Sequence, residues 1–521
     1  MKKAYPQAVG IAEKKNAGVA AQTFAPWNTR VITGRYALLS SLVMSQRGFK
    51  LPLTLRERLF LRLSQLAEKV DVLENSFVFR PDDLQPHWRL ILNFLHREGI
   101  IKRPGFSQTL FANDGPKFPS ISIDTEVGTA ERDGKKIELY GFGAAETFEE
   151  AASKATGELL ERFFLHAHNC HTFFSSTTEA LGKKGARFLD PESLPSFKSW
   201  QKKAGVNAYA KGDELAWVTA EDLHSGESLA VPAQLVFWNY DTRLAQEPTL
   251  GYHTTNGGGG HFTREDAYLS AIYETIQRDG FLIYWLNNLS PAVIDVASAL
   301  DEYPALAKML DYLERYHIRP IFLNTTSDLK VPSLICAIID ENGKVPLITI
   351  GGGTGFDFEA MALSALYEAV SVNQGRRDKK PFTLPTNYEP FIDESIKRSE
   401  RLSLWQGDKF VKRFNFFVSG KKQSVNEYMG ELRAFRGEAE ELAYTLSTLE
   451  NAGYRVYGYE VKNDVLKKLG YHVVKAIIPG LIPLYLQENL ALLGAERLRT
   501  VPEKLGYAPA KEPNPWPHLF P

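Results

Sequence analysis

The segment Asn256-Gly257-Gly258-Gly259-Gly260-His261-Phe262-Thr263-Arg264-Glu265-Asp266 decides how the fold is interpreted. Its glycine run is followed by Thr263, a residue suited to the N-cap of a helix, and by Asp266 three residues later. An apolar pattern with helical spacing then continues from Ala267 to Trp285. The segment therefore predicts a glycine-rich turn that leads into a capped helix.

The same pattern occurs twice more in the chain. One copy lies in residues 140–164, with Thr147 as the predicted N-cap and Glu150 completing a capping box. The other lies in residues 351–378, with Asp357 as the predicted N-cap. The three copies are too far apart in sequence to be units of a solenoid repeat, so they predict three separate helices of one domain.

Each predicted helix carries a glutamate eleven residues after its cap, namely Glu158, Glu274 and Glu368. An alanine lies three residues before each glutamate, namely Ala155, Ala271 and Ala365. Eleven residues are about three helical turns, so each carboxylate is expected about 16 Å along its helix on a comparable face. Glu161 and Gln277 follow the first two glutamates by three residues and share their faces.

Carboxylates that converge from several helices are typical of a site for a hard cation, and magnesium is favoured where phosphate is also bound. Taken singly, each helix also fits a solvated face with Glu–Arg pairs. The threefold recurrence favours a shared metal–phosphate site. None of the glycine-rich segments matches a Walker or Gly-x-Gly-x-x-Gly sequence, so they are weak indications when taken alone.

These residues resemble the YcaO superfamily of ATP-dependent enzymes that activate peptide-backbone amides. The segment Ala151-Ala152-Ser153-Lys154-Ala155-Thr156-Gly157-Glu158-Leu159-Leu160-Glu161-Arg162 is similar to the first family signature. Thr255-Asn256-Gly257 with Glu274-Thr275-Ile276-Gln277-Arg278-Asp279 is similar to the second, and Gly351-Gly352-Gly353 with Glu368 is similar to the third. The resemblance spans roughly residues 120 to 380, and the C-terminal residues extend it to the end of the chain.

The resemblance implies an α+β fold, a YcaO-type mixed α/β domain with ATP bound between helices, and ATP and Mg2+ as cofactors. It assigns magnesium binding to Glu158, Glu161, Glu274 and Glu368. It assigns ATP binding to Lys154, Glu158, Arg162, Asn256, Glu274, Gln277, Arg278 and Glu368. Three positions depart from the family pattern: Gln277 replaces a glutamate, Lys154 replaces a serine, and Ser371 replaces a glutamine, with Gln374 one turn later.

The chain ends in Pro513-Asn514-Pro515-Trp516-Pro517-His518-Leu519-Phe520-Pro521, whose alternating prolines predict an extended backbone. On composition alone this is a stiff end or a ligand of a proline-binding domain. It also resembles the tail that projects into the active site of azoline-forming YcaO enzymes. The predicted catalytic tail residues are Pro513, Pro515, Pro517, His518 and Pro521. The carboxylate of Pro521 and the ring of His518 are the candidate bases, and a surface histidine is the alternative for His518.

The resemblance implies an ATP-dependent cyclodehydratase that converts Cys, Ser or Thr of a ribosomal precursor peptide to thiazoline or oxazoline by phosphorylating the backbone amide oxygen. One alternative is thioamide or amidine formation by the same amide activation. Another is a non-catalytic YcaO-like module that binds peptide. The implied partners are a precursor peptide with a leader sequence, a leader-binding protein that resembles ubiquitin-activating enzymes, and a flavin dehydrogenase. Whether two copies of the chain form a homodimer stays open at the level of sequence.

The chain has 521 residues, of which 44% are hydrophobic and 24% charged, which suits two or three globular domains. Its net charge is −1, but residues 1–104 hold 17 Lys and Arg against 8 Asp and Glu. We therefore predict a basic N-terminal region over 1–110 and a YcaO domain over 111–521 with the proline-rich tail at 513–521. Helical patterns over 55–66 and 84–98, the second followed by Gly99, predict a small, mainly helical region that resembles a winged helix.

Three interpretations of the basic region stay open: a packed extension of the main domain, a module that docks an acidic peptide, and, less favoured, a DNA-binding wing. Cys170 and Cys336 are too few for a disulfide framework or a cysteine-based zinc site. No apolar run reaches the length of a membrane span, and the N-terminus lacks the apolar region of a signal peptide. These features predict a cytoplasmic protein.

Overall fold

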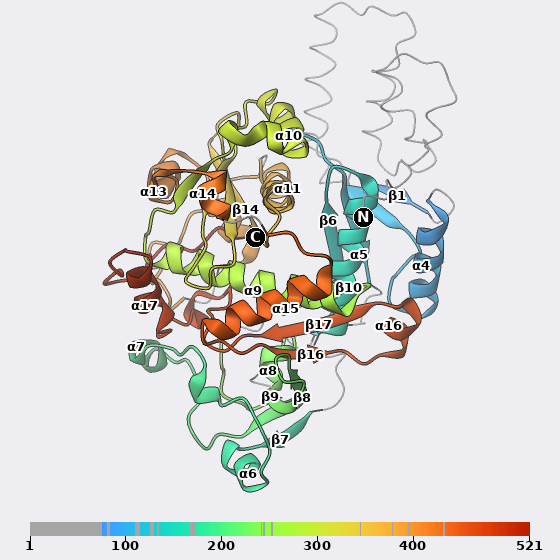
Figure 1. Cartoon of the computed structure of the whole chain (residues 1–521), viewed down its shortest axis with the longest axis vertical. Coiled ribbons are helices and arrows are strands. Elements are labelled where there is room, and N and C mark those ends of the chain that lie inside the picture. The colour runs from blue at the N-terminus through green and yellow to red at the C-terminus, as the bar shows by residue number, and fades with distance from the viewer. Residues whose placement is uncertain are drawn as a thin grey trace, which may run out of the picture. The chain divides into compact units, whose positions relative to one another are not determined.

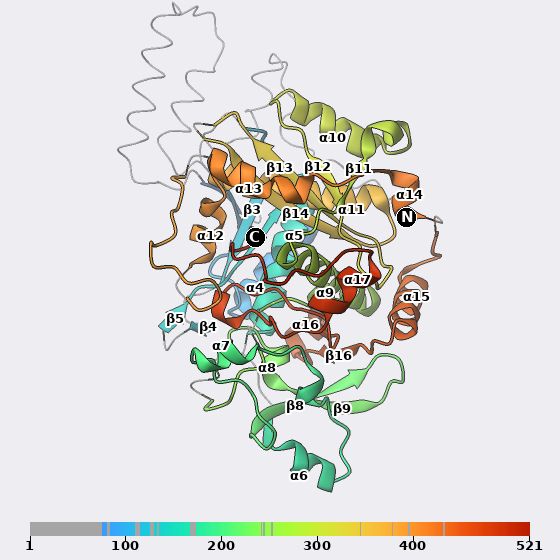
Figure 2. The ribbon, with the colours of Figure 1, turned by 90° about the vertical axis from the view of Figure 1, so that its left-hand side faces the viewer.

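A computed structural model describes residues 76–80, 84–109, 115–125, 130–132, 135–166, 173–240, 242, 245–251, 254–343, 345–377, 379–393, 396–430 and 433–520. The predicted helix over 55–66, Cys170 and the carboxylate of Pro521 lie outside the described residues. The structure confirms the predicted mixed α+β class, because helices and several sheets alternate along the chain (Figures 1 and 2).

The α-helices are α4 (Pro86–Arg97), α5 (Phe148–Phe164), α6 (Thr178–Lys183), α7 (Ser199–Lys203), α8 (Ala233–Val236), α9 (Arg264–Leu286), α10 (Pro304–Glu314), α11 (Phe358–Arg376), α12 (Arg398–Leu404), α13 (Asp408–Val418), α14 (Val425–Met429), α15 (Glu438–Asn451), α16 (Asp464–Leu469) and α17 (Arg497–Lys504). Short 3-10 helices are η4 (Pro191–Ser193), η5 (Val296–Glu302) and η6 (Glu488–Leu490).

The strands are β1 (Ser76–Phe79), β2 (Phe106–Thr109), β3 (Ser120–Asp124), β4 (Ala130–Arg132), β5 (Lys135–Ile137), β6 (Tyr140–Ala144), β7 (Phe174–Ser176), β8 (Leu215–Asp222), β9 (Ser228–Pro232), β10 (Gly258–His261), β11 (Ala292–Asp295), β12 (Ile321–Asn324), β13 (Ser333–Asp340), β14 (Leu347–Thr354), β15 (Lys422–Ser424), β16 (Tyr457–Glu460) and β17 (His472–Ile477).

The first of two compact units comprises residues 1–112, 117–129 and 138–159. Its described part is an antiparallel sheet in the order β1-β2-β3-β6, together with α4 and the first part of α5. Helix α4 confirms the helix predicted over 84–98. It ends before Gly99, whose φ of 73° is a left-handed conformation that glycine adopts without strain. The predicted boundary between residues 110 and 111 stays a prediction.

The second unit comprises residues 113–116, 130–137 and 160–521. It contains a six-stranded sheet in the order β10-β17-β16-β8-β7, with β9 paired to β8, and a five-stranded sheet in the order β14-β13-β12-β11-β15. Helix α9 contacts β10 and β17 of the first sheet and β13 and β14 of the second (Figure 1). Most of its residues are buried, so this helix is the central element of the unit.

The structure confirms the three predicted N-caps, because α5, α9 and α11 each begin one residue after the predicted cap. The hydroxyl of Thr147 accepts a hydrogen bond from Glu150 N at 3.3 Å, and α5 begins at the next residue. Thr263 caps α9 by accepting from Asp266 N at 3.2 Å, and Asp357 caps α11 by accepting from Ala360 N at 3.0 Å. Each bond satisfies one of the free N–H groups of the first helical turn.

The prediction of glycine-rich turns before these helices is wrong, because most of those glycines lie in strands. Gly141 and Gly143 belong to β6, Gly258 to Gly260 belong to β10, and Gly351 to Gly353 belong to β14. Glycine is depleted in strands in general, and where it occurs it often marks a close approach of another backbone. The partner that approaches is the helix that follows each strand, as described below.

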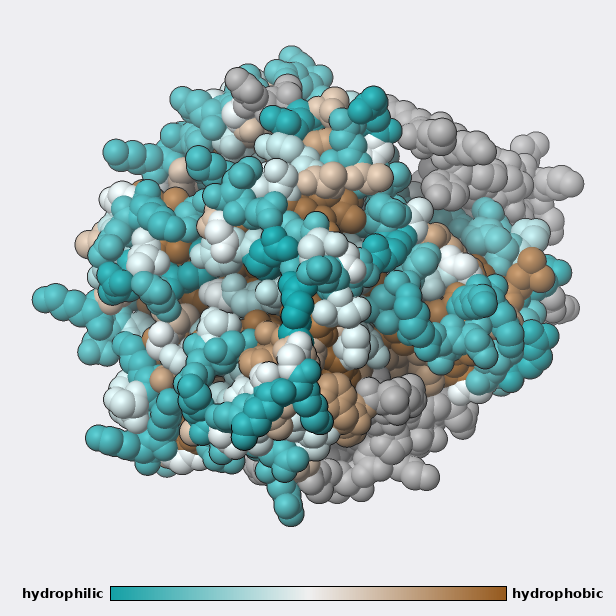
Figure 3. Space-filling view, turned by 60° about the horizontal axis from the view of Figure 1, so that its bottom comes forward, coloured by the Kyte–Doolittle hydropathy of each residue, from teal (hydrophilic) through white to brown (hydrophobic). Residues whose placement is uncertain are grey.

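On the face drawn in Figure 3, hydrophilic residues predominate and hydrophobic residues are visible between them. The large apolar side chains pack instead in interior clusters. The largest cluster combines the C-terminal half of α9 with Trp405, Phe414 and Phe520. Among the described residues, no helix has both the length and the apolar character that crossing a bilayer requires.

Candidate functional site

The three signature glutamates make the same contact in all three copies. Each carboxylate accepts a hydrogen bond from a backbone N–H of the preceding glycine-containing segment. The distances are 2.5 Å from Phe142 N to Glu158 Oε2, 2.7 Å from Gly257 N to Glu274 Oε2, and 2.8 Å from Gly352 N to Glu368 Oε2. One oxygen of each carboxylate is therefore held against the glycine-containing segment.

The glycines of the strands allow helix and strand to touch at the alanines that recur before the glutamates. A Cβ atom at Gly141 would overlap the carbonyl oxygen of Ala155, and one at Gly351 would overlap that of Ala365. At Gly259 the added Cβ would lie 3.1 Å from the Cβ of Ala271. Glycine on the strand and alanine on the helix therefore bring the two backbones close enough for each glutamate to reach an amide of the strand.

This packing predicts that Gly351→Ala lowers the free energy of unfolding by about 1–3 kcal/mol, because backbone would have to move. The new Cβ would lie 2.7 Å from Ala369 N as well as overlapping Ala365 O. Urea unfolding of the purified protein measures the change. Gly182→Ala is the matched control, because that exposed glycine lies in α6 with open space around it. It should be neutral or stabilise by about 0.5–1 kcal/mol. Equal stability of Gly351→Ala and the wild type would contradict this account.

In the second unit, several predicted site residues lie together around β10 and β14. A Cβ at Gly258 would lie 2.5 Å from Glu161 Oε1, and a Cβ at Gly352 would lie 2.5 Å from the amide carbon of Gln277. Glu161 therefore lies against the residue that follows Gly257, and Gln277 lies against Gly352, so both side chains are next to an amide that a signature glutamate accepts from. Arg278 donates to Gln277 Oε1 and reaches Glu274 Oε1 at 3.4 Å. Glu274, Gln277 and Arg278 thus form one hydrogen-bonded network, and Gln277 and Glu368 both lie against Gly352.

Lys475 of β17 is a further charged residue of this region that the sequence analysis missed. It pairs with Gly258 in the β10–β17 register, and it is 4% exposed. Its ammonium group donates to the carbonyl oxygens of Thr254 at 3.0 Å and Asn256 at 2.6 Å. Burial lowers the pKa of Lys475 to about 8, against the opposite effect of the charges of Glu274 and Glu161.

Two buried nitrogen atoms of predicted ATP-binding residues have no hydrogen-bond partner within the described part of the chain. They are Nδ2 of Asn256 and Nε of Arg278. Asn256 is otherwise fixed, because its Oδ1 accepts from Leu484 N at 3.1 Å. Buried donors are rarely left unpaired, so such atoms fit a ligand with acceptor oxygens, as a nucleotide has.

The carboxylates fit magnesium that arrives with nucleotide. In the described ranges, no group of three or more His, Cys, Asp or Glu side chains is placed to hold a metal ion. Magnesium in nucleotide sites is commonly bound by one or two carboxylates together with phosphate oxygens and water. Glu161 and Glu274 of the second unit, and Glu158 of the first, have the chemistry for this. The assignment of each as a ligand stays a prediction.

Two other predicted ATP-binding residues, Lys154 and Arg162, and one position near a departure from the family pattern, Gln374, lie as follows. Lys154 is exposed on α5 in the first unit. The guanidinium of Arg162 lies 6.0 Å from the ring centroid of Trp238 in the second unit. Gln374, which follows the departing Ser371, is buried and donates to the carbonyl oxygen of Pro116. Gln374 therefore links two segments of the second unit in this structure.

The proline-rich tail is packed into the second unit. Asn514 N donates to Leu286 O at 2.8 Å, and the indoles of Trp285 and Trp405 donate to the carbonyl oxygens of Trp516 and Pro517 at 3.2 and 2.9 Å. Pro515 is exposed, whereas Pro517, Leu519 and Phe520 are buried. The ring of Phe520 lies under Arg278, whose guanidinium carbon is 3.8 Å from the ring centroid. The tail therefore reaches the network of Glu274 and Gln277.

His518 is buried and has both ring nitrogens engaged. Nδ1 accepts from Phe520 N at 3.3 Å, so Nε2 carries the proton and donates to Tyr485 O at 2.6 Å. Burial and the charges of Arg401 and Arg278 hold the pKa of His518 well below its ordinary value. His518 is not the surface histidine considered above, and this geometry favours a role in fixing the tail over one as a base.

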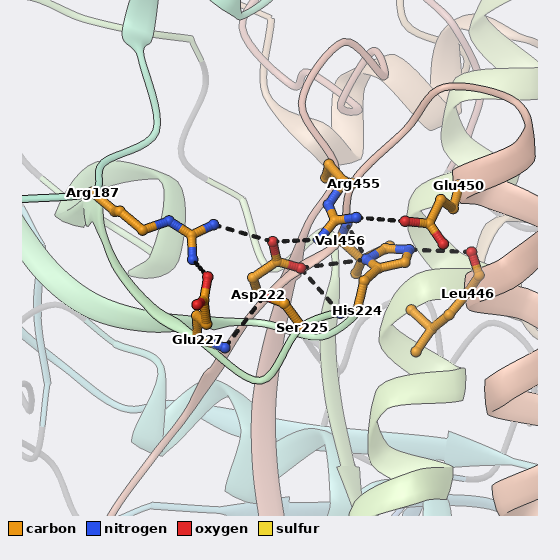
Figure 4. Close-up of polar contacts among 9 residues, drawn as sticks. All are labelled: Arg187, Asp222, His224, Ser225, Glu227, Leu446, Glu450, Arg455 and Val456. Atoms are coloured by element: carbon orange, nitrogen blue, oxygen red, sulfur yellow. Dashed lines mark hydrogen bonds and ion pairs between the residues drawn. The ribbon is translucent and has the colours of Figure 1, made fainter.

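A second charged cluster, drawn in Figure 4, joins the end of β8 to α15 and to the segment between α15 and β16. Buried Asp222 accepts from Arg455 Nη2 at 2.7 Å and from His224 N at 3.0 Å, and Arg187 Nη2 lies 3.6 Å away. Burial would raise the pKa of Asp222, but the hydrogen bonds from Arg455 and His224 and their charges lower it overall. His224 also bonds Leu446 O through Nε2. The partners of Asp222 and His224 named here all lie within the second unit, so the cluster stabilises the β8–β9 hairpin against α15.

Comparison with known proteins agrees with these features. The family described as YcaO cyclodehydratase, ATP- and Mg2+-binding, matches residues 142–482. An uncharacterized protein of Methanothermobacter thermautotrophicus is 27% identical over 370 residues, which are 69% of this chain and 86% of that protein.

Two solved structures show the same fold. A heterocyclase in complex with substrate and cofactor aligns with a TM-score of 0.63 and 18% identity, covering 82% of this chain and 57% of that one. The chain thus spans little more than half of that heterocyclase. YcaO from Methanopyrus kandleri, bound with AMPPCP and Mg2+, aligns with a TM-score of 0.51 and 18% identity, covering 78% of this chain and 92% of that one. Because the family match begins in β6, includes all three glutamate helices and covers more than half of the sequence, the predicted resemblance is confirmed, and the chain belongs to the YcaO family of ATP- and Mg2+-binding cyclodehydratases.

Proposed function

We propose that this protein is a peptide cyclodehydratase that forms thiazoline or oxazoline rings from Cys, Ser or Thr residues of a ribosomal precursor peptide. The observation that carries the proposal is the position of the tail. Its penultimate residue, Phe520, packs on Arg278, which also contacts Glu274 and Gln277. A tail that ends beside the predicted nucleotide site is what the resemblance to azoline-forming members implies.

In the proposed reaction, a side-chain thiol or hydroxyl of the peptide attacks the carbon of the preceding backbone amide and loses its proton. ATP bound with Mg2+ supplies the phosphoryl group that makes the amide oxygen a leaving group. Departure of that oxygen as phosphate leaves the ring, and the peptide has lost one water. The role of the chain is chiefly to position the groups and to balance charge, as is general in phosphoryl transfer.

Different residues are proposed to bind the nucleotide, to bind magnesium and to accept the proton of the attacking side chain. Asn256 and Arg278 offer the unpaired donors described above to phosphate or ribose oxygens, and Arg278 also holds Glu274. Glu158, Glu161, Glu274 and Glu368 are the proposed acceptors for magnesium. The carboxylate of Pro521 is the proposed base for the attacking side chain, because His518 is engaged on both ring nitrogens.

The peptide needs a docking surface beyond the reacting residue. Residues 1–110 are the proposed docking module for the leader peptide, because this region holds 17 Lys and Arg against 8 Asp and Glu, although the whole chain has a net charge of −1. A separate leader-binding protein that resembles ubiquitin-activating enzymes is the alternative. A flavin dehydrogenase would be a partner that oxidises the rings after they form.

The mass of the modified peptide tests the proposal. The purified protein, incubated with ATP, Mg2+ and a precursor peptide rich in Cys, Ser and Thr, should yield products lighter by about 18 Da per ring, with ADP formed in step. The same reaction is run with and without the leader-binding protein. A gain of about 16 Da in the presence of sulfide would instead indicate thioamide formation. Failure to bind ATP with Mg2+ in calorimetry would favour the non-catalytic alternative.

A further inference from the structure

Lys475 is the one charged residue in an otherwise apolar stretch of β17, Val473-Val474-Lys475-Ala476-Ile477. A buried ammonium group is costly unless charges and hydrogen bonds compensate it. Two of its hydrogen bonds go to the carbonyl oxygens of Thr254 and Asn256, in the segment that leads into β10. These two hydrogen bonds hold the segment before β10 in place, but carbonyl oxygens do not neutralise the positive charge of Lys475.

The neutralising charges are carboxylates of the proposed magnesium site. The negative charges of Glu274 and Glu161 raise the pKa of Lys475 against the larger, opposite effect of burial. Both carboxylates are held next to Lys475 through β10. Glu274 accepts from Gly257 N at 2.7 Å, and Glu161 Oε1 lies against Gly258, the residue opposite Lys475 in the sheet.

Around β10, the two carboxylates nearest Lys475 are matched by two cations, and Glu368 at β14 adds one further negative charge. Glu161 and Glu274 carry two negative charges, and Lys475 and Arg278 carry two positive charges, with Arg278 Nη2 3.4 Å from Glu274 Oε1. A divalent cation that entered alone would face two fixed positive charges. A cation that enters with nucleotide brings phosphate charges with it, which compensate the excess.

We propose that Lys475 is a positioning residue whose buried charge acts on Glu161 and Glu274 in the absence of nucleotide and makes magnesium binding at these carboxylates depend on nucleotide phosphate. The inference rests on the assignment of these glutamates to magnesium, which is part of the proposed function. It does not depend on which peptide product the protein makes. It also accounts for a lysine at a position where an apolar residue would complete the strand.

The test measures metal binding directly, with Mn2+ as the probe and electron paramagnetic resonance as the readout. Wild-type protein should bind Mn2+ about 10-fold or more weakly without nucleotide than with AMPPCP. Lys475→Met, which removes the charge with little change in shape, should bind Mn2+ without nucleotide about 10-fold or more tightly than the wild type. Lys504→Met is the matched control, because Lys504 pairs with Asp328 in a different cluster of the same unit.

The double variant Lys475→Met/Glu274→Gln removes one charge of each sign. It should be more stable than Lys475→Met, although below the wild type because the hydrogen bonds to Thr254 and Asn256 are still missing, and it should lose the Mn2+ binding gained by the single variant. If Lys475→Met alone does not fold, the inference still requires this double variant to fold, and failure of that rescue would overturn it. Unchanged Mn2+ affinity in a folded Lys475→Met protein would also overturn it. A protein that passes these tests but makes no ring would instead refute the proposed function.

Discussion

Glu274→Gln is expected to lower the rate of ring formation by about 100- to 1000-fold while leaving the fold intact, because removing one fixed group that stabilises developing charge typically costs that much. The glutamine keeps an oxygen that can accept the hydrogen bond from Gly257 N, so the contact between α9 and β10 is preserved. It loses the charge that faces Lys475 and the proposed magnesium ion. Single-turnover kinetics followed by peptide mass give the rate, and thermal unfolding gives the stability.

Glu265→Gln is the matched control for this substitution. Glu265 lies in the first turn of the same helix and is not part of the network around Arg278. Its loss should change the rate less than twofold and cost a few tenths of a kcal/mol at most, through the helix dipole. A Glu274→Gln protein with wild-type turnover at low magnesium would refute the assignment of Glu274 to the metal.

Phe520→Leu is expected to slow ring formation by about 10- to 30-fold with a moderate loss of stability of about 1–2 kcal/mol. Leucine fills much of the volume that Phe520 occupies against Phe281, but it has no ring to face Arg278. A desolvated cation–π contact is worth about 2 kcal/mol, which corresponds to roughly 30-fold in rate if all of it is used in the reaction. Peptide mass kinetics and urea unfolding measure the two quantities.

Phe414→Leu separates packing from function. Phe414 belongs to the same apolar cluster and packs on Trp405 and Phe417, away from the guanidinium of Arg278. Its replacement should cost a similar free energy of unfolding and leave the rate nearly unchanged. If both variants slow the reaction equally, the tail acts through general stability, and its proposed catalytic role fails.

The parts of the site that depend on local sequence could be predicted. Thr147, Thr263 and Asp357 are cap residues whose hydrogen bonds involve groups three residues away, and the three helices begin where these residues indicate. The phase of the glutamates follows from helix geometry, which repeats along any helix. The resemblance to the family then placed the helices in one fold.

The parts that depend on tertiary packing could not be predicted. Glycine-rich segments favour turns locally, and only the close contact with α5, α9 and α11 makes them strands in this chain. Lys475 is separated by more than two hundred residues from Thr254 and Asn256, to which it donates, and nothing in its own strand indicates those partners. The burial of His518 likewise depends on Tyr485 and Phe281, not on the proline pattern around it.

The packed tail has a consequence for how the protein is made. Translation adds residues 514–520 after every helix and strand that they contact, including α9 and α13. Domains generally begin to fold from their N-terminal parts during synthesis. The aromatic cluster around Trp285 and Trp405 can therefore close only after the segment that contains Trp516, Pro517 and Phe520 has been synthesised. A variant that lacks residues 514–520 should therefore be more sensitive to proteases in this cluster than the wild type.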